Sequence, residues 1–295
     1  MPDDIRIAMI GLDTSHTIEF TSLIQSPEVP AGDRVGGARV VSCMRFPSAF
    51  QSEEGQDGRQ KQMEDWGVKV TRNFDEAVAD CDALMLEVND PALHLKYFEP
   101  CVNLGKPIFL DKPMADNRAN GAEILRLTKE KGLRVMSSSG LRFAPALIEA
   151  CEAMPNPKFT SMYGPFGGGP GGELIVWYGV HAFEMLERAM GRGAKSVNVQ
   201  RDGVGAVCIV EYGEGRRGVV ELTNDSWVYG GALRSESEMV NFNVDLNLTY
   251  KVTLPRIIDF LRGGAPSVEI EDTFEVMCML DAADRSRISG EKAII

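Results

Sequence analysis

Short apolar runs alternate with helix-like segments over the first half of the chain. Residues 5–10 are apolar apart from Arg6, and Gly11 ends the run. Apolar side chains then recur at roughly helical spacing, at Ile18, Phe20, Leu23 and Ile24. Further apolar runs at 37–44, 81–88, 106–114 and 133–139 are separated by segments long enough for helices. This alternation predicts a Rossmann-like, doubly wound parallel sheet with helices on both faces.

The pattern changes near residue 150. Residues 159–176 are glycine-rich and cannot form one regular element throughout, and residues 180–191 predict a helix. Strand-like runs then follow one another without helices between them, which favours an antiparallel sheet. They are 195–201, 205–212, 216–223 and a last strand segment within 232–245, and two helices follow at 254–264 and 271–290.

We therefore expect two domains. Residues 1–137 would form the Rossmann-like dinucleotide-binding domain, and residues 138–295 an α+β domain for substrate binding and oligomerisation. The second sheet would be largely antiparallel with one open face, and the final helices could pack back on the first domain. Apolar residues alternate on both faces of 205–212 and 216–223, which predicts a homodimer or homotetramer formed through the open face.

Composition and charge exclude several classes of partner. The chain has 295 residues, 44% of them hydrophobic and 25% charged, and a net charge of −12. This negative charge argues against binding to nucleic acid or to an anionic membrane. Its apolar runs are shorter than the roughly 18 residues of a membrane span, and acidic residues stand where a signal peptide would be basic. The six scattered cysteines are read as reduced core thiols, so we expect a cytoplasmic protein with a small-molecule substrate.

The first turn departs from the dinucleotide-binding fingerprint. That fingerprint reads G-x-G-x-x-G, and this chain reads G-L-D-T-S-H, with Asp13 and His16 in place of two glycines. Asp13 is a good helix N-cap and would place negative charge where the phosphates bind. Thr14 and Ser15 could still donate hydrogen bonds to a phosphate. Dinucleotide binding is therefore expected to be weakened.

Five motifs in order carry a family resemblance. Along the chain they are NDPALH, GKPIFLDKP, an R-F-x-P at Arg142, the segment GELIVWYGVHAFE, and the closing helix with S-x-x-S-G-E. In these motifs the chain resembles the glucose-fructose oxidoreductase / inositol dehydrogenase (Gfo/Idh/MocA) family of NAD(P)-dependent sugar and cyclitol dehydrogenases. The resemblance spans nearly the whole chain and implies that family's two-domain fold.

The resemblance implies roles for individual residues. Lys112 and His181 would hold and deprotonate a substrate hydroxyl as the hydride leaves, and Glu184 takes the place of the motif's last acid. Trp177 stands where the family has an aspartate and cannot replace a carboxylate. Together with the turn analysis, the cofactor-binding set becomes Gly11, Asp13, Thr14, Ser15, His16, Arg45, Asn89, His94 and Asp111. Arg45, after the second strand, suits a 2′-phosphate and slightly favours NADP over NAD.

Three functions stay open. The first is an NAD(P)-dependent oxidoreductase that acts on a sugar, a cyclitol or a related polyol or keto compound. The second is a ligand-binding or regulatory protein that has kept the fold and lost the dinucleotide. The third is a metal-dependent lyase or hydrolase in which Asp13, His16, His94 and His181 converge on an ion. In the first case Lys112 and His181 should share one crevice with Gly11 and Asn89.

Overall fold

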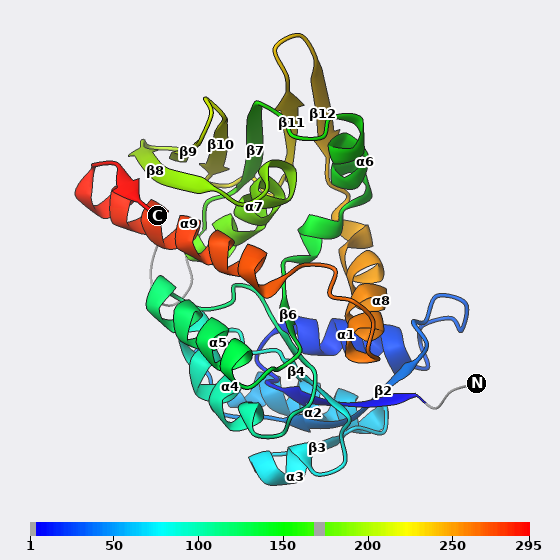
Figure 1. Ribbon diagram of the computed structural model, residues 1–295. Coiled ribbons are helices and arrows are strands. Elements are labelled where there is room, and N and C mark those ends of the chain that lie inside the picture. The colour runs from blue at the N-terminus through cyan, green and yellow to red at the C-terminus, as the bar shows by residue number, and fades with distance from the viewer. Residues whose placement is uncertain (1–3, 168–174) are drawn as a thin grey trace. The chain divides into compact units, whose positions relative to one another are not determined.

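The computed structural model describes residues 4–167 and 175–295, which form two compact units. The first unit contains the described residues up to Asp116, together with Ala122–Ser137 and Tyr250–Ile270. The second contains Asn117–Gly121, Ser138–Thr249 and Glu271–Ile295 as far as they are described. Figure 1 colours these segments along the chain. Each unit is described below by itself.

The first unit is built on a six-stranded parallel sheet, which confirms the predicted Rossmann-like fold. Each strand predicted in this half is present. In spatial order the strands are β3 (Lys69–Thr71), β2 (Ala38–Met44), β1 (Ile5–Ile10), β4 (Ala83–Leu86), β5 (Ile108–Leu110) and β6 (Val135–Ser137). The order reverses between β1 and β4, so the carboxyl ends of these two strands flank the switch point.

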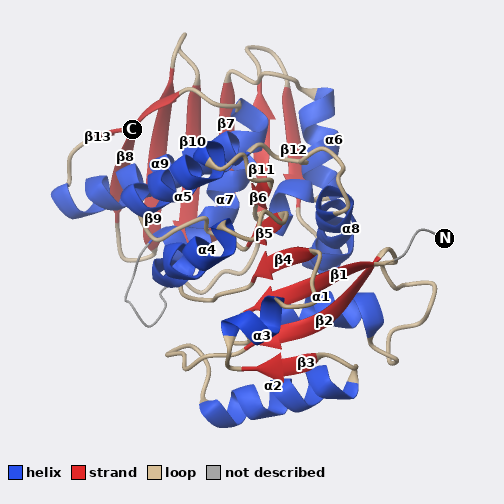
Figure 2. Cartoon of the chain, turned by 60° about the horizontal axis from the view of Figure 1, so that its bottom comes forward, coloured by secondary structure: helices blue, strands red, loops and turns tan. Residues whose placement is uncertain are grey.

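Helices connect these strands, as the sequence pattern predicts. They are α1 (Ser15–Gln25), α2 (Glu53–Asp65), α3 (Phe74–Val78), a 3-10 turn at Pro91–Leu93 that leads into α4 (His94–Val102), and α5 (Arg118–Glu130). Helix α2 runs along the β3 edge (Figure 2). Helix α8 (Thr249–Leu261) lies beside α1 (Figure 1), and Leu254 and Ile257 of α8 share one buried core with Ile7 and Phe20.

The second unit contains a mixed, seven-stranded sheet. In spatial order its strands are β12 (Met239–Asn243), β11 (Gly230–Arg234), β7 (Phe159–Pro165), β10 (Arg217–Thr223), β9 (Gly205–Tyr212), β8 (Ala194–Arg201) and β13 (Ala293–Ile294). All neighbours pair antiparallel except β7 and β10, which are parallel. The expected largely antiparallel sheet is confirmed.

Three details of the second unit differ from the sequence pattern. Residues 232–245 form a hairpin rather than one strand, because the Ser235 hydroxyl accepts hydrogen bonds from the Ser237 and Glu238 amides and turns the chain. The first part of the glycine-rich segment forms β7, while residues 168–174 lie outside the described residues. Helix α6 (Pro145–Ala153) follows the 3-10 turn Gly140–Phe143 and was not expected.

Two long helices complete this unit. Helix α7 (Ile175–Met190) begins earlier than predicted, so Trp177 and Gly179 lie on the helix. It packs so closely on the sheet that a Cβ at Gly218 of β10 would lie 2.5 Å from Leu186 Cδ1. Helix α9 (Ile270–Ser289) and a 3-10 turn at Leu246–Leu248 are the remaining helical segments described. Each helix of the described residues is too short or too polar to cross a membrane.

A buried ion network joins α7 to the turn before α6. The Arg142 guanidinium lies 3.2 Å from a Glu184 carboxylate oxygen and 2.5 Å from one of Glu187. Another oxygen of Glu184 accepts a hydrogen bond from the Ser139 amide. All three ionic side chains are almost completely buried. Burial raises the pKa of Glu184 to about 7, against the opposing effect of the Arg142 charge.

This raised pKa makes the stability of the second unit depend on pH. The folded protein binds the Glu184 proton more tightly than the unfolded chain does. The stabilisation is therefore complete below about pH 4.5 and is lost as the pH rises through about 7. We expect thermal unfolding to show a loss of up to about 3 kcal/mol across this range, and Glu184→Gln to remove most of it. Glu236→Gln, which alters an exposed pair with Lys158, is the control. Equal losses in wild type and Glu184→Gln would assign the effect to other groups.

Candidate functional site

The ends of β1 and β4 lie in direct backbone contact at Gly11. This residue has φ +119°, and a Cβ added to it would lie 2.0 Å from the Glu87 carbonyl oxygen. A side chain is therefore excluded both by the backbone conformation and by the neighbouring strand. The one glycine that remains of the fingerprint is needed to bring the chain after β1 against the chain after β4.

Asp13 does not cap the helix that follows it, so the N-cap predicted from sequence is wrong. The cap of α1 is Thr14, whose hydroxyl accepts from the His16 amide. The Asp13 carboxylate instead accepts hydrogen bonds from the Ser48 hydroxyl at 2.7 Å and from the Asn89 amide at 3.1 Å. Its residue is only 2% exposed, and burial raises its pKa. Asp13 thus ties three loops together and points away from solvent.

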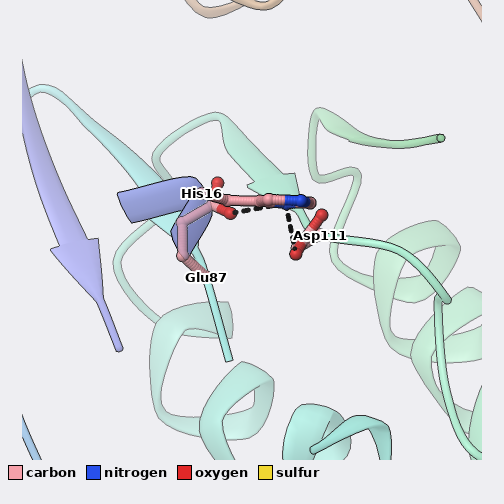
Figure 3. A group of neighbouring side chains, drawn as sticks. All are labelled: His16, Glu87 and Asp111. Atoms are coloured by element: carbon pink, nitrogen blue, oxygen red, sulfur yellow. Dashed lines mark ion pairs between the residues drawn. The ribbon is translucent and has the colours of Figure 1, made fainter. Parts of the chain in front are cut away.

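His16 lies in a cluster with two buried carboxylates (Figure 3). Its Nδ1 is 2.9 Å from Asp111 Oδ2 and 3.9 Å from Glu87 Oε2. The three side chains come from the first turn of α1 and from the residues directly after β4 and β5. The imidazole also meets Phe20 and Tyr250 edge to face, at centroid distances of 5.8 and 5.5 Å.

Glu87 is a site residue that the sequence analysis missed. It lies near the end of the apolar run 81–88, which predicts a buried strand. A charged residue at the carboxyl end of such a strand is the sequence signal for a site residue. Its side chain is completely buried, and neither carboxylate oxygen has a hydrogen-bond partner among the residues described. Burial, and next the charge of Asp111, raise its pKa well above the usual value.

Asp111 and Lys112 follow β5 at the same edge of the sheet. Asp111 accepts a hydrogen bond of 2.8 Å from the Lys112 backbone amide. Burial opposes ionisation of Asp111, but the charges of His16 and Lys112 outweigh it and hold its pKa at about 2. The Lys112 charge also favours ionisation of Glu87. Lys112 is only half-buried and is therefore the accessible cation beside two buried carboxylates.

Tyr250 is a second residue that was not expected here. It begins the part of α8 that belongs to the first unit. Its hydroxyl is hydrogen-bonded to the Ser15 side chain, and its ring lies against His16. Burial raises its pKa to about 12, and the charges of Asp111 and Glu87 act in the same direction. Its position in sequence, far from every motif, gave no signal.

His94 lies apart from this cluster and joins two loops of the first unit. Its Nε2 is 2.7 Å from the Val88 carbonyl and its Nδ1 is 3.4 Å from the Met114 carbonyl. The imidazole is completely buried. These contacts favour the Nε2–H tautomer and a positioning role, since Val88 follows Glu87 and Met114 lies two residues after Lys112.

Arg45 is already engaged by helix α2. Its guanidinium donates to Asp57 at 2.6 Å, Gln60 at 2.7 Å and Glu53 at 2.7 Å. A 2′-phosphate would have to displace these partners. The argument from Arg45 for NADP over NAD therefore loses its basis.

His181 lies in the second unit, on α7. Its Nδ1 is 2.6 Å from the Ser139 hydroxyl, which also accepts from the Leu141 amide. Its ring meets Tyr229 edge to face at 5.5 Å. Trp177 precedes it by one helical turn and so shares its face of α7. Because Lys112 belongs to the first unit, the shared crevice of Lys112 and His181 stays a prediction.

The metal set considered from sequence differs from the cluster observed. Among the described residues, the histidine and carboxylates that meet are His16, Glu87 and Asp111. Asp13 and His94 make the separate contacts given above, and His181 belongs to the other unit. Only His16 is common to both sets.

Comparison with known proteins agrees with the resemblance read from the sequence. Residues 46–139 match the family model described as an oxidoreductase family with an NAD-binding Rossmann fold, GFO_IDH_MocA. The structure is similar to myo-inositol dehydrogenase from Lactobacillus casei in complex with NAD(H) and myo-inositol, with a TM-score of 0.83 and 13% identity. That match covers 99% of this chain and 97% of the other.

Two further solved structures show the same fold. Myo-inositol 2-dehydrogenase from Lactobacillus plantarum matches with a TM-score of 0.80 and 13% identity, covering 99% of this chain and all of the other. GenD2 from gentamicin A biosynthesis, in complex with NAD, matches with a TM-score of 0.80 and 14% identity, covering 100% and 97%. Over residues 46–139 the chain is thus similar to the Gfo/Idh/MocA oxidoreductases with an NAD-binding Rossmann fold, and over its whole length it shares the fold of these solved structures.

Proposed function

We propose that the protein is a dinucleotide-dependent oxidoreductase of a small polyhydroxylated substrate, a sugar, a cyclitol or a related keto compound. The observation that carries this proposal is the placing of Lys112 at the carboxyl end of β5, with its charge beside Asp111 and Glu87. A lysine there can exchange a proton with a substrate hydroxyl at the edge of the sheet where the fold binds ligands. The myo-inositol bound to the similar Lactobacillus casei enzyme supports the substrate class.

The residues around Gly11 fit a dinucleotide. Helix α1 begins at Ser15, which is exposed, so the positive end of the helix dipole faces the loop after β1. Asp13 is turned inward onto Ser48 and Asn89 and does not fill this space. The turn, Gly11 with Thr14 and Ser15, would hold the pyrophosphate, and His16, Asn89, His94 and Asp111 would line or support the site. We favour NAD, since Arg45 is engaged by α2.

The acid–base work falls to Lys112 and His181. Hydride transfer is the chemistry that a nicotinamide would supply when bound at this edge of the sheet. Lys112 would take the hydroxyl proton. His181, whose Nδ1 lies 2.6 Å from the Ser139 hydroxyl, is the second group that we propose for the substrate hydroxyl. Trp177, one turn before His181, supplies an apolar face at the position where the resembled family motif has an aspartate.

Substitution of Lys112 tests this assignment. We expect Lys112→Ala to lower turnover of the oxidised or reduced polyol by about two to four orders of magnitude, because a positioned acid–base group is lost. Dinucleotide affinity, measured by calorimetry, should stay nearly unchanged. The matched control is Lys106→Ala, since Lys106 is also half-buried but donates to the Val78 carbonyl and Cys81 Sγ. Turnover near wild type in Lys112→Ala would make this lysine structural.

A second candidate function rests on the turn itself. Asp13 and His16 replace two glycines of the fingerprint, which favours a family member that binds a ligand but no dinucleotide. Titration of the protein with NADH and NADPH separates the two functions. Saturable binding supports the oxidoreductase, and its absence up to millimolar concentration supports the ligand-binding protein.

The charge of Asp13 should control dinucleotide affinity. Asp13→Asn removes the charge and can keep both hydrogen bonds, to Ser48 and to the Asn89 amide. We expect it to tighten NADH binding by up to about tenfold. Asp13→Gly restores the second glycine of the fingerprint but removes the contacts to both loops, so we expect a smaller gain from it. Weaker binding by Asp13→Asn would show that the carboxylate itself contacts the cofactor.

We further propose a homodimer or homotetramer formed through the second unit's sheet. On one face of β9 and β10 the side chains of Val207, Ile209 and Val219 are only half-buried within the chain. Burying such a face against a second copy would remove apolar surface from water. Light scattering at micromolar concentration should give a mass of two or four chains, and Ile209→Lys should lower it. A monomeric wild type would contradict the proposal.

A further inference from the structure

Three groups able to bind a metal meet at the carboxyl edge of the first unit's sheet. They are His16 Nδ1, a carboxylate oxygen of Glu87 and one of Asp111, and all lie within 4.8 Å of one another (Figure 3). Each comes from a different element: α1 begins at its Thr14 cap, β4 pairs with β1, and β5 pairs with β4. The cluster is therefore fixed by the fold rather than by the flexibility of one loop.

Glu87 gives a second, independent indication of a ligand in this cluster. A buried carboxylate is normally satisfied by hydrogen bonds or by a counter-ion. Glu87 is completely buried, yet its two oxygens find no hydrogen-bond donor among the described residues, and its nearest ionic contact is the 3.9 Å to His16. The other acid of the cluster, Asp111, has the Lys112 amide as a donor. An added proton or an added cation is needed to stabilise Glu87.

The spacing of the ligand atoms suits a small divalent ion. Metal–ligand bonds of about 2.0–2.2 Å in a tetrahedral arrangement place neighbouring ligand atoms about 3.4 Å apart. The distances from His16 Nδ1, 2.9 Å to Asp111 and 3.9 Å to Glu87, lie on either side of that value. The His16 side chain is 17% exposed, so solvent can reach the cluster to supply a fourth ligand.

The ligand types narrow the choice of ion. Imidazole nitrogen with carboxylate oxygen suits zinc, manganese or another first-row transition metal, whereas calcium and magnesium prefer oxygen ligands alone. Two further groups interact with the acids. Lys112 is a cation close enough to influence both Glu87 and Asp111, and its charge will weaken metal affinity. Burial raises the pKa of Tyr250, and the charges of both acids and of Glu19 raise it further. A moderate affinity is expected, weaker than that of a structural zinc site.

We propose that His16, Glu87 and Asp111 form a binding site for a divalent transition-metal ion. The ion would neutralise the two buried carboxylates at once, with water in the open position. The site belongs to the first unit alone, so it requires neither a dinucleotide nor His181. This proposal does not rest on the proposed oxidoreductase function.

Zinc binding by the whole chain tests the proposal. Protein freed of metal with a chelator is dialysed against Zn²⁺, and bound metal is measured by mass spectrometry. We expect one ion per chain for wild type and an affinity lower by about tenfold or more for Glu87→Gln and for Asp111→Asn. Asp13→Asn is the matched control, because Asp13 is a buried carboxylate of the same unit whose oxygens already accept hydrogen bonds. It should bind zinc as wild type does.

A Co²⁺ spectrum decides the case even where a variant fails to fold. Wild type should give visible bands of nitrogen and oxygen coordination without a thiolate charge-transfer band. Less than a tenth of an ion per chain, a thiolate band, or unchanged affinity in a folded Glu87→Gln would each overturn the site. Zinc binding without NADH binding would reject the oxidoreductase function and support this site. NADH binding without zinc binding would reject this site and support the oxidoreductase function.

Discussion

The backbone contact between Gly11 and Glu87 is the constraint on which the rest of the site depends. A Cβ at Gly11 would lie 2.0 Å from the Glu87 carbonyl, so β1 and β4 can end side by side only with glycine here. That approach places the first turn of α1 over the residues that follow β4. His16 consequently reaches Glu87 and Asp111, and Asp13 reaches the Asn89 amide. The contacts of His16 and Asp13 at the switch point therefore depend on a position that tolerates no side chain.

Two of the buried ionic clusters among the described residues offset the cost of desolvation in different ways. In the second unit, the Arg142 guanidinium lies between Glu184 and Glu187 and offsets much of their burial cost. In the first unit, Glu87 and Asp111 lie beside His16 and are both influenced by the charge of Lys112. The pKa of Glu87 is nevertheless raised, whereas that of Asp111 is lowered. The first network holds structural elements together. The second retains an unsatisfied carboxylate, which is typical of a site that acts on a ligand.

The sequence predicted the strands better than it predicted the contacts. Apolar runs marked β1 and β4 because a parallel sheet buries both faces of its central strands. The same rule concealed the role of Glu87, because this charged residue was counted as part of the apolar run that precedes it. The N-cap was misplaced by one residue because Asp13 and Thr14 are both good caps, and the choice depended on Ser48, 35 residues away. Lys112 and His16 were found through motifs, whereas Tyr250 depended on how α8 packs.

The altered fingerprint is better explained as a rebuilt turn than as a decayed one. A decayed turn would leave its new side chains without specific partners. Instead Asp13 joins the loops after β1, β2 and β4, and His16 lies 2.9 Å from Asp111 between two aromatic rings. Neither side chain covers the amino-terminal end of α1 at Ser15, so an anion could bind there. The His16 imidazole nitrogen lies beside the acids at the strand ends, where it could bind a metal with them. The same six residues can therefore serve a phosphate on one side and a cation on the other.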